Sequence, residues 1–131
     1  MIELSKKLGE MEYDGLLAGL TPPVQTGKVT LRKLGTAGTL KRGTLLGISS
    51  SDSKCVILGT TAGGGETITP CAVLCDDTDV GTADDVVAIA YTAGLFNANR
   101  IDVKSGYTIT AADLDTLRKY DIILKAAQAA Q

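Results

Sequence analysis

Residues 69–125 have the sequence TPCAVLCDDTDVGTADDVVAIAYTAGLFNANRIDVKSGYTITAADLDTLRKYDIILK, and this stretch decides the fold. An apolar run over residues 71–75 lies between Pro70 and Asp76, two residue types that bound strands, and it predicts a first strand. A second strand is predicted over residues 86–92, which are apolar on both alternating faces. Such a strand is expected to be central in its sheet, with both faces covered.

A one-faced strand, a capped helix and a last strand complete this stretch. Residues 100–104 alternate between apolar and charged side chains, as a strand with one face in solvent does. Thr110 can cap a helix, and Asp113 then falls in the first helical turn, near the positive end of the helix dipole. The helix is expected to be short, because residues 122–124 form a β-favouring run that returns the chain to the sheet.

The chain upstream of this stretch is also strand-like. From Gly27 on, further strands are predicted near residues 28–32, 44–48, 54–58 and 67–70. Turn residues recur at a spacing of about ten residues, which is typical of β-barrels and β-sandwiches. The sequence therefore predicts a mainly β (β-rich α+β) fold with one short helix near the carboxyl end.

The length of the chain bounds the number of domains. Its 131 residues, 44% of them hydrophobic, suffice for one core and are few for two. We expect an extended amino-terminal arm over residues 1–24, a single β-rich domain over residues 25–125 and a flexible tail over residues 126–131.

Residues 1–24 have the composition of an arm. Their charges alternate in sign without a helical stripe, and Gly9, Gly15 and Gly19 weaken any helix. An apolar segment then ends in two prolines, which favour an extended backbone and cannot donate hydrogen bonds within a sheet. This segment is therefore expected to suit the surface of a partner better than the centre of its own domain. A terminus that is disordered until it binds fits the same pattern.

The composition also bears on membrane and nucleic-acid partners. No window approaches the roughly 20 apolar residues of a membrane span, and the first residues carry charges where a signal peptide has an apolar core. We therefore expect no membrane partner and synthesis in the cytoplasm. A net charge of −2, with one Phe, four Tyr and no Trp, offers nucleic acid neither attraction nor stacking platforms.

The charges are distributed unevenly along the chain. Residues 28–42 contain five basic and no acidic side chains, whereas residues 43–99 contain one Lys and seven acidic side chains. Two interpretations stay open. The two groups form separate solvated faces, or they meet across the contact between neighbouring copies in an oligomer.

No catalytic, cofactor-binding or metal-binding constellation is apparent in the sequence. The acidic turn Asp76, Asp77 and Asp79 lacks the further ligands of a calcium loop, although a magnesium site there is the basis of an enzyme alternative. The glycine-rich loop at residues 60–66 lacks the Lys and Ser/Thr of a phosphate loop. Because the chain also has no His, the commonest acid/base residue, we expect neither an enzyme nor a cofactor.

The three cysteines do not form a predicted zinc site. On one strand Cys71 and Cys75 would lie about 13 Å apart, too far for two thiolates on one zinc ion. They are expected to be buried thiols that share a face with Val73. With Cys55 the count is odd, and a protein made in a reducing cytoplasm is not expected to carry a disulfide framework.

The order of five segments resembles the lambda-type head decoration proteins of tailed bacteriophages. No single segment is diagnostic, but the ordered set is specific and covers about residues 16–125. The segments are an apolar arm ending in TPPVQTGKVTL (21–31), LKRGTLLG (40–47), AVLCDDTDV (72–80), VVAIAYTAGLFNANRI (86–101) and GYTITAADLDTLRKYDIIL (106–124).

The resemblance implies a fold and a role. The fold is a small compact β-barrel or β-tulip-like domain. The role is that of a non-enzymatic cement protein on the outer surface of the virion capsid, which trimerises on local threefold positions of the expanded head and stabilises it against internal DNA pressure. Its implied partners are the major capsid protein and two further copies of itself.

The resemblance also implies a contact region, because the amino-terminal arm of that family commonly reaches the capsid surface. Here the implied capsid-binding residues are Leu16, Leu17, Ala18, Leu20, Pro22, Pro23, Val24 and Thr26.

The alternative function is a receptor- or glycan-binding module of a phage fibre or surface structure, with an exposed site around residues 95–100.

Overall fold

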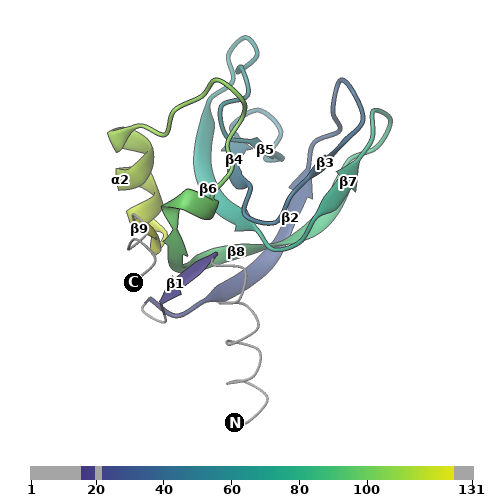
Figure 1. The fold of residues 1–131 in the computed structure, drawn as a ribbon. Helices are drawn as coiled ribbons and strands as arrows, with labels where there is room; N and C mark the ends of the chain where they lie inside the picture. The colour runs from purple at the N-terminus through teal and green to yellow at the C-terminus, as the bar shows by residue number, and fades with distance from the viewer. Residues whose placement is uncertain (1–15, 20–21, 126–131) are drawn as a thin grey trace.

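The computed structural model describes residues 16–19 and 22–125. Within these residues the chain forms nine strands, one α-helix and one 3-10 helix (Figure 1). In chain order they are β1 (Leu17–Gly19), β2 (Gln25–Leu31), β3 (Gly38–Leu40), β4 (Leu45–Ser49), β5 (Cys55–Ile57), β6 (Ile68–Leu74), β7 (Thr78–Val80), β8 (Val86–Asn97), η1 (Ala98–Arg100), α2 (Ala111–Lys119) and β9 (Ile122–Lys125).

Five of the strands form a closed barrel. β2 pairs in parallel with β5 and antiparallel with β8, β4 lies antiparallel between β5 and β6, and β6 pairs with β8 to complete the circle. Closure satisfies the backbone groups that an open sheet would expose at its edges. The expectation of a mainly β fold with a compact barrel and one short helix near the carboxyl end is confirmed.

Two smaller sheets extend the barrel. β3 and β7 form an antiparallel two-stranded ribbon that projects from one side in Figure 1. The carboxyl half of β8 continues beyond the barrel and lies between β1, which is antiparallel to it, and β9, which is parallel. A single strand, β8, therefore belongs to both the barrel and the three-stranded sheet beside it.

Two hydrophobic cores lie on opposite faces of the same strands. The barrel core fills the interior of the barrel and consists of Leu31, Leu40, Leu46, Cys55, Ala72, Leu74, Val80, Ala88 and Ala90. The outer core lies between the barrel wall and α2 with its flanking segments, and consists of Leu16, Leu17, Leu45, Leu58, Val73, Cys75, Tyr91, Phe96, Leu117 and Ile122. Neighbouring residues such as Leu45 and Leu46 alternate between the two cores, as the strand period requires.

The helix α2 begins and ends as its sequence predicts. The Thr110 hydroxyl accepts a hydrogen bond from the Asp113 backbone N–H (3.1 Å), and the Asp113 carboxylate accepts one from the Thr110 N–H (3.0 Å), which completes a capping box. Leu117 is fully buried in the outer core. The helix ends at Lys119 with Tyr120 as its C-cap, and Asp121, with φ +62°, leads directly into β9.

The prediction of a strand over residues 100–104 is wrong. Ala98–Arg100 form a 3-10 helix, and the residues after it make only an isolated bridge, between Asp102 and Thr44. The segment crosses strand ends: Asp102 bonds the turn before β4, while the Lys104 N–H donates to the Leu58 carbonyl after β5 (2.9 Å). Because it pairs with two strands in turn, it forms no continuous ladder with either.

The predicted coverage of both faces of β8 is also wrong for its first half. β8 is central, with β1, β2, β6 and β9 as its neighbours. However, the side chains of Val87 and Ile89 are 64% and 44% exposed on the outside of the barrel. The outer core covers that face of β8 only from Tyr91 onward.

The prediction that Cys71, Val73 and Cys75 share one face is wrong, because the pairing of β6 with β4 has an irregular register. Pro70 does not bound the strand but lies inside β6, and the pairing of β6 with β4 shifts between the pairs Leu46–Ala72 and Gly47–Pro70. A bulge of this kind leaves one residue unpaired and breaks the alternation of faces. Cys71 therefore packs against the barrel core, whereas Val73 and Cys75 belong to the outer core.

The tail predicted over residues 126–131 lies outside the described residues. In the part of the chain that the structure covers, none of the helices has the length and apolarity needed to cross a bilayer.

We predict that Gly43→Ala lowers the free energy of unfolding by about 2 kcal/mol, because of backbone strain and a clash. Gly43 has φ +94°, and an added Cβ would lie 2.6 Å from the Arg100 carbonyl oxygen. Urea unfolding followed by far-UV circular dichroism measures the change. Gly81→Ala is the matched control, since no heavy atom lies within 4 Å of its added Cβ. Equal stability of the two variants would contradict the prediction.

Candidate functional site

The start of the predicted capsid-binding arm is built into the domain. Leu16 and Leu17 are only 2% and 6% exposed and belong to the outer core with Phe96 and Leu117. β1 pairs with β8 in the register Leu17 opposite Phe96, and the Leu16 carbonyl accepts a hydrogen bond from the Asn97 N–H (2.7 Å). The structure thus differs from the expectation that this apolar segment is unsuited to its own domain.

The remaining predicted arm residues lie closer to solvent. Ala18, Pro23 and Thr26 are exposed, and Pro22 is half-buried. Val24 is half-buried and packs against the outer core. Leu20 lies outside the described residues. Contact of any of these residues with a capsid stays a prediction.

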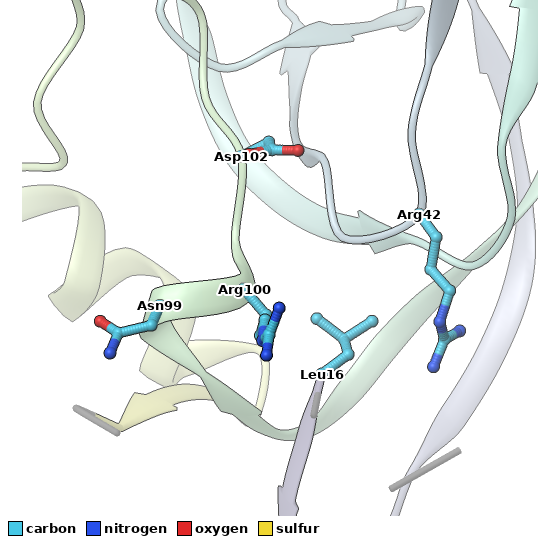
Figure 2. A pocket seen from close by; sticks show the side chains of 5 residues that line it. All are labelled: Leu16, Arg42, Asn99, Arg100 and Asp102. Atoms are coloured by element: carbon cyan, nitrogen blue, oxygen red, sulfur yellow. The ribbon is translucent and has the colours of Figure 1, made fainter. Parts of the chain in front are cut away.

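A pocket of about 280 Å³ opens beside the point where β1 begins. Figure 2 shows the guanidinium groups of Arg42 and Arg100 on either side of Leu16, with the Asp102 side chain away from both. Asn99 completes the lining. The pocket therefore brings together two cations from distant parts of the sequence at the base of the predicted arm.

Arg42 is held rigidly at this pocket. Its Nη1 atom donates hydrogen bonds to the Cys75 carbonyl (2.8 Å) and to the Tyr91 hydroxyl (2.7 Å), and its guanidinium carbon lies 5.5 Å from the centre of the Tyr91 ring. Its backbone N–H donates to Asp77 Oδ1 (2.8 Å). These hydrogen bonds from the charged guanidinium and the cation–π contact together fix the orientation of the side chain.

Arg100 is held at the same pocket through its backbone. It is the last residue of η1, which Asn97 caps by accepting a hydrogen bond from the Asn99 N–H (3.0 Å). The next residues are fastened to the turn that carries Arg42, since the Asp102 N–H donates to the Gly43 carbonyl (3.0 Å). The Arg100 side chain itself is exposed.

Sequence reasoning did not find this pair of arginines. Arg42 precedes the strand predicted near residues 44–48 and Arg100 begins the strand predicted over residues 100–104. Only the crossing of the 100–104 segment over the start of β4 brings them together. No local pattern signals such a crossing, because it depends on pairing between distant residues.

The basic group at residues 28–42 contacts the acidic group at residues 43–99 within one molecule, since Arg32 contacts both Asp52 and Glu66. Within the acidic group, its one Lys, Lys54, contacts Asp85. Asp85 also accepts a hydrogen bond from the Lys33 N–H (2.9 Å). Part of the uneven charge is thus compensated inside the protein. A charge contact between neighbouring copies stays a prediction.

Glu66 is the centre of the most extensive of these networks. Its Oε1 atom accepts hydrogen bonds from Arg32, Ser49 and Ser51, and its Oε2 atom accepts one from the Gly63 N–H (2.8 Å). These bonds, the one from Arg32 first, lower the pKa of Glu66 from 4.5 to about 2. The carboxylate therefore connects the glycine-rich loop to Ser49 of β4 and to Arg32, which directly follows β2.

The acidic turn and the cysteines, which were weighed as metal sites, serve local structure. Asp77 accepts from the Arg42 N–H, and Asp79 accepts from the Thr39 hydroxyl (2.6 Å) across the β3–β7 ribbon. The Sγ atoms of Cys55 and Cys71 lie 3.9 Å apart as free thiols, and burial raises the pKa of Cys75 to about 11. Among residues 16–19 and 22–125, no group of three potential metal ligands is found.

Comparison with known proteins yields one family. A family model described as bacteriophage lambda head decoration protein D matches residues 6–122 of the 131-residue chain. No curated protein sequence matches it. The match includes β1, the whole barrel and α2.

We predict that Glu66→Gln destabilises the protein near neutral pH and that its deficit relative to the wild type shrinks as the pH falls from 4.5 toward 2. The folded state lowers the pKa of Glu66, so the ionised carboxylate stabilises the fold above its unfolded pKa, and this stabilisation is lost as the group protonates. Thermal melts of both proteins across this pH range measure the effect. The exposed Asp84→Asn is the control, and a deficit that does not change with pH would refute the linkage.

Proposed function

The chain belongs to the family of bacteriophage lambda head decoration protein D, a phage head decoration protein family, and we propose that it cements the expanded head as a trimer. In this proposal the trimers occupy local threefold positions and hold neighbouring major capsid subunits together against the pressure of packaged DNA. The family match over residues 6–122 is the observation that supports the proposal.

The proposal includes a location and a chemical class. As a member of a head decoration family the protein is a component of the virion capsid. We propose that it lies on the outer surface, after synthesis in the bacterial host cytoplasm, and that its role is structural and not enzymatic. A cement protein needs a rigid body and many weak contacts, which symmetry adds into strong retention.

The arm is proposed to make the capsid contact, with its anchor in the outer core. Leu16 and Leu17 are buried, so they fasten the segment to the domain and are not themselves a free contact surface. In the described residues β1 pairs along one side with β8, so its other side can receive a strand of the capsid protein. Exposed Ala18, Pro23 and Thr26 would then lie against the partner.

Self-association is proposed to use the exposed apolar residues of β8. Val87 and Ile89 are the most exposed large apolar side chains on the barrel wall, at 64% and 44%. Being two residues apart on one strand, they point to the same side, and Lys28 of β2 lies opposite Ile89 in the register. An apolar centre beside a charged residue is typical of a contact between subunits.

The alternative, a receptor- or glycan-binding module with a site around residues 95–100, finds less support. Phe96 is fully buried in the outer core, and β1 and β9 lie on either side of the end of β8. Only Asn99 and Arg100 of that segment are exposed.

We predict that replacing Ala18, Pro23 and Thr26 together by Glu abolishes saturable binding to expanded heads. Charges at these positions would have to be desolvated against the capsid without partners. Purified protein is co-sedimented with heads of its own phage that lack it, in compact and in expanded form. Wild-type protein should bind the expanded form only.

The matched control carries the same three charges elsewhere, at the exposed loop residues Thr61, Ala62 and Thr82. Thermal melts confirm that both variants are folded. The triple arm variant is preferable to deletion of residues 1–24, which would also remove Leu16 and Leu17 from the outer core. If wild-type protein binds neither kind of head, the cement function is excluded.

We predict that Val87→Ser combined with Ile89→Ser prevents trimer formation on the head, because the contact between copies loses its apolar centre. Chemical cross-linking of head-bound protein, resolved by denaturing electrophoresis, should give trimers for the wild type and monomers for the variant. Tyr120→Ser with Ile123→Ser, the other exposed apolar pair, is the control. Trimers that persist in the β8 variant would exclude this surface.

A further inference from the structure

We propose that the thiols of Cys55 and Cys71 together bind one soft, two-coordinate metal ion such as Cu⁺. The Sγ atoms of these residues lie 3.9 Å apart at the barrel core, and both are free thiols. The site includes none of the residues proposed for capsid contact or self-association, so its function is additional to the cement function.

The two thiols come from strands that do not pair with each other. Cys55 lies in β5 and Cys71 in β6, and β4 lies between these strands and pairs with both. Cys71 is at the register shift in the pairing of β6 with β4, and it packs against the barrel core, to which Cys55 belongs. Closure of the barrel therefore brings the two sulfur atoms together.

The distance between the sulfur atoms suits a metal ion better than a disulfide. Neighbouring strands are about 4.8 Å apart, so the backbones of β5 and β6 are expected to lie about 9 to 10 Å apart across β4. A disulfide needs Cα atoms within about 7 Å of each other. Two thiolates at about 2.3 Å from one metal ion lie about 3.8 Å apart at a tetrahedral angle and about 4.6 Å apart in line with the ion. The observed 3.9 Å falls within this range.

The number of ligands selects the kind of metal. In the part of the chain that the structure describes, no third side chain of a metal-ligating type joins Cys55 and Cys71. A structural zinc site takes four protein ligands, so two thiols are too few for it. Soft cations with a preference for thiolates, such as Cu⁺, Ag⁺ and Hg²⁺, are satisfied by two sulfur ligands in line.

The surroundings of the pair allow a metal ion to enter and then protect it. Cys55 is only 2% exposed, among apolar side chains such as Leu31 and Leu46, which keep water away from the metal–sulfur bonds. Cys71 is half-buried, so it offers a path from solvent and lowers the cost of burying charge. Its thiol donates a hydrogen bond that lowers the pKa of Cys55, which prepares one thiolate ligand.

A bound ion is expected to stabilise the barrel. It would join β5 to β6 across β4, and the two sulfur atoms are held at this distance only in the folded chain. A ligand that binds the folded state alone raises the melting temperature, here by at least about 5 °C when the site is saturated.

The test is transfer of Cu⁺ to the purified protein without oxygen. Cu⁺ is supplied as its coloured complex with bicinchoninate, and the loss of colour measures uptake. The wild type should take up one Cu⁺ per chain and gain thermal stability. Cys55→Ala and Cys71→Ala should bind Cu⁺ at least about a hundredfold more weakly, because each removes a direct ligand. Cys75→Ala is the matched control, since it removes a buried thiol of the outer core and should keep both effects.

Three results would overturn the proposal. Uptake by Cys71→Ala equal to that of the wild type would mean that a single thiol captures the ion. Loss of uptake in Cys75→Ala would place the site elsewhere. If the wild type takes up no Cu⁺ but forms an internal disulfide with oxidised glutathione, the pair is a redox site. Thermal melts without metal establish that the variants are folded, and Cys71→Ala, at the half-buried position, serves alone if Cys55→Ala is unstable.

Discussion

Strand β8 contributes side chains to both hydrophobic cores, and the rest of the structure depends on this constraint. Its residues Ala88 and Ala90 face the barrel core, whereas Tyr91 and Phe96 face the outer core. Gly94 lies where β8 leaves its pairing with the barrel strand β2 and begins to pair with β9, with φ +149°, and an added Cβ there would lie 2.9 Å from the Phe96 ring. Only glycine fits this position, so the barrel and the sheet that holds the arm share one backbone.

Pairing with the shared strand β8 explains how a segment as short as β1 can hold the arm on the domain. β1 has three residues, too few to be stable by strand pairing alone. Burial of Leu16 and Leu17 adds about 2 kcal/mol for each side chain. Because both leucines pack in the outer core with Phe96 and Leu117, a force on the arm is carried into β8 and α2 and not into a flexible loop.

The parts of the fold that could be predicted are those with local signals. The barrel strands follow from short β-favouring segments bounded by turn residues, and α2 follows from its capping residues, because both depend on neighbours in the sequence. β1 was missed because Leu17–Gly19 has no strand pattern of its own and is ordered by β8. For residues 100–104 the alternation of faces was right, since Ile101 and Val103 pack against the outer core, but the pairing partners lie far away in the sequence.

The candidate site was predicted less completely than the fold, and the reason is physical. Apolar character identifies Leu16 and Leu17 as contact residues, yet it does not say whether the contact is internal or external. The arginine pair could not be foreseen, because it exists only where the turn at Gly43 is bonded to Asp102. The buried leucines position the segment on the domain. The apolar pattern therefore located the segment, whereas its partner within the domain depends on pairing with β8, which is distant in the sequence.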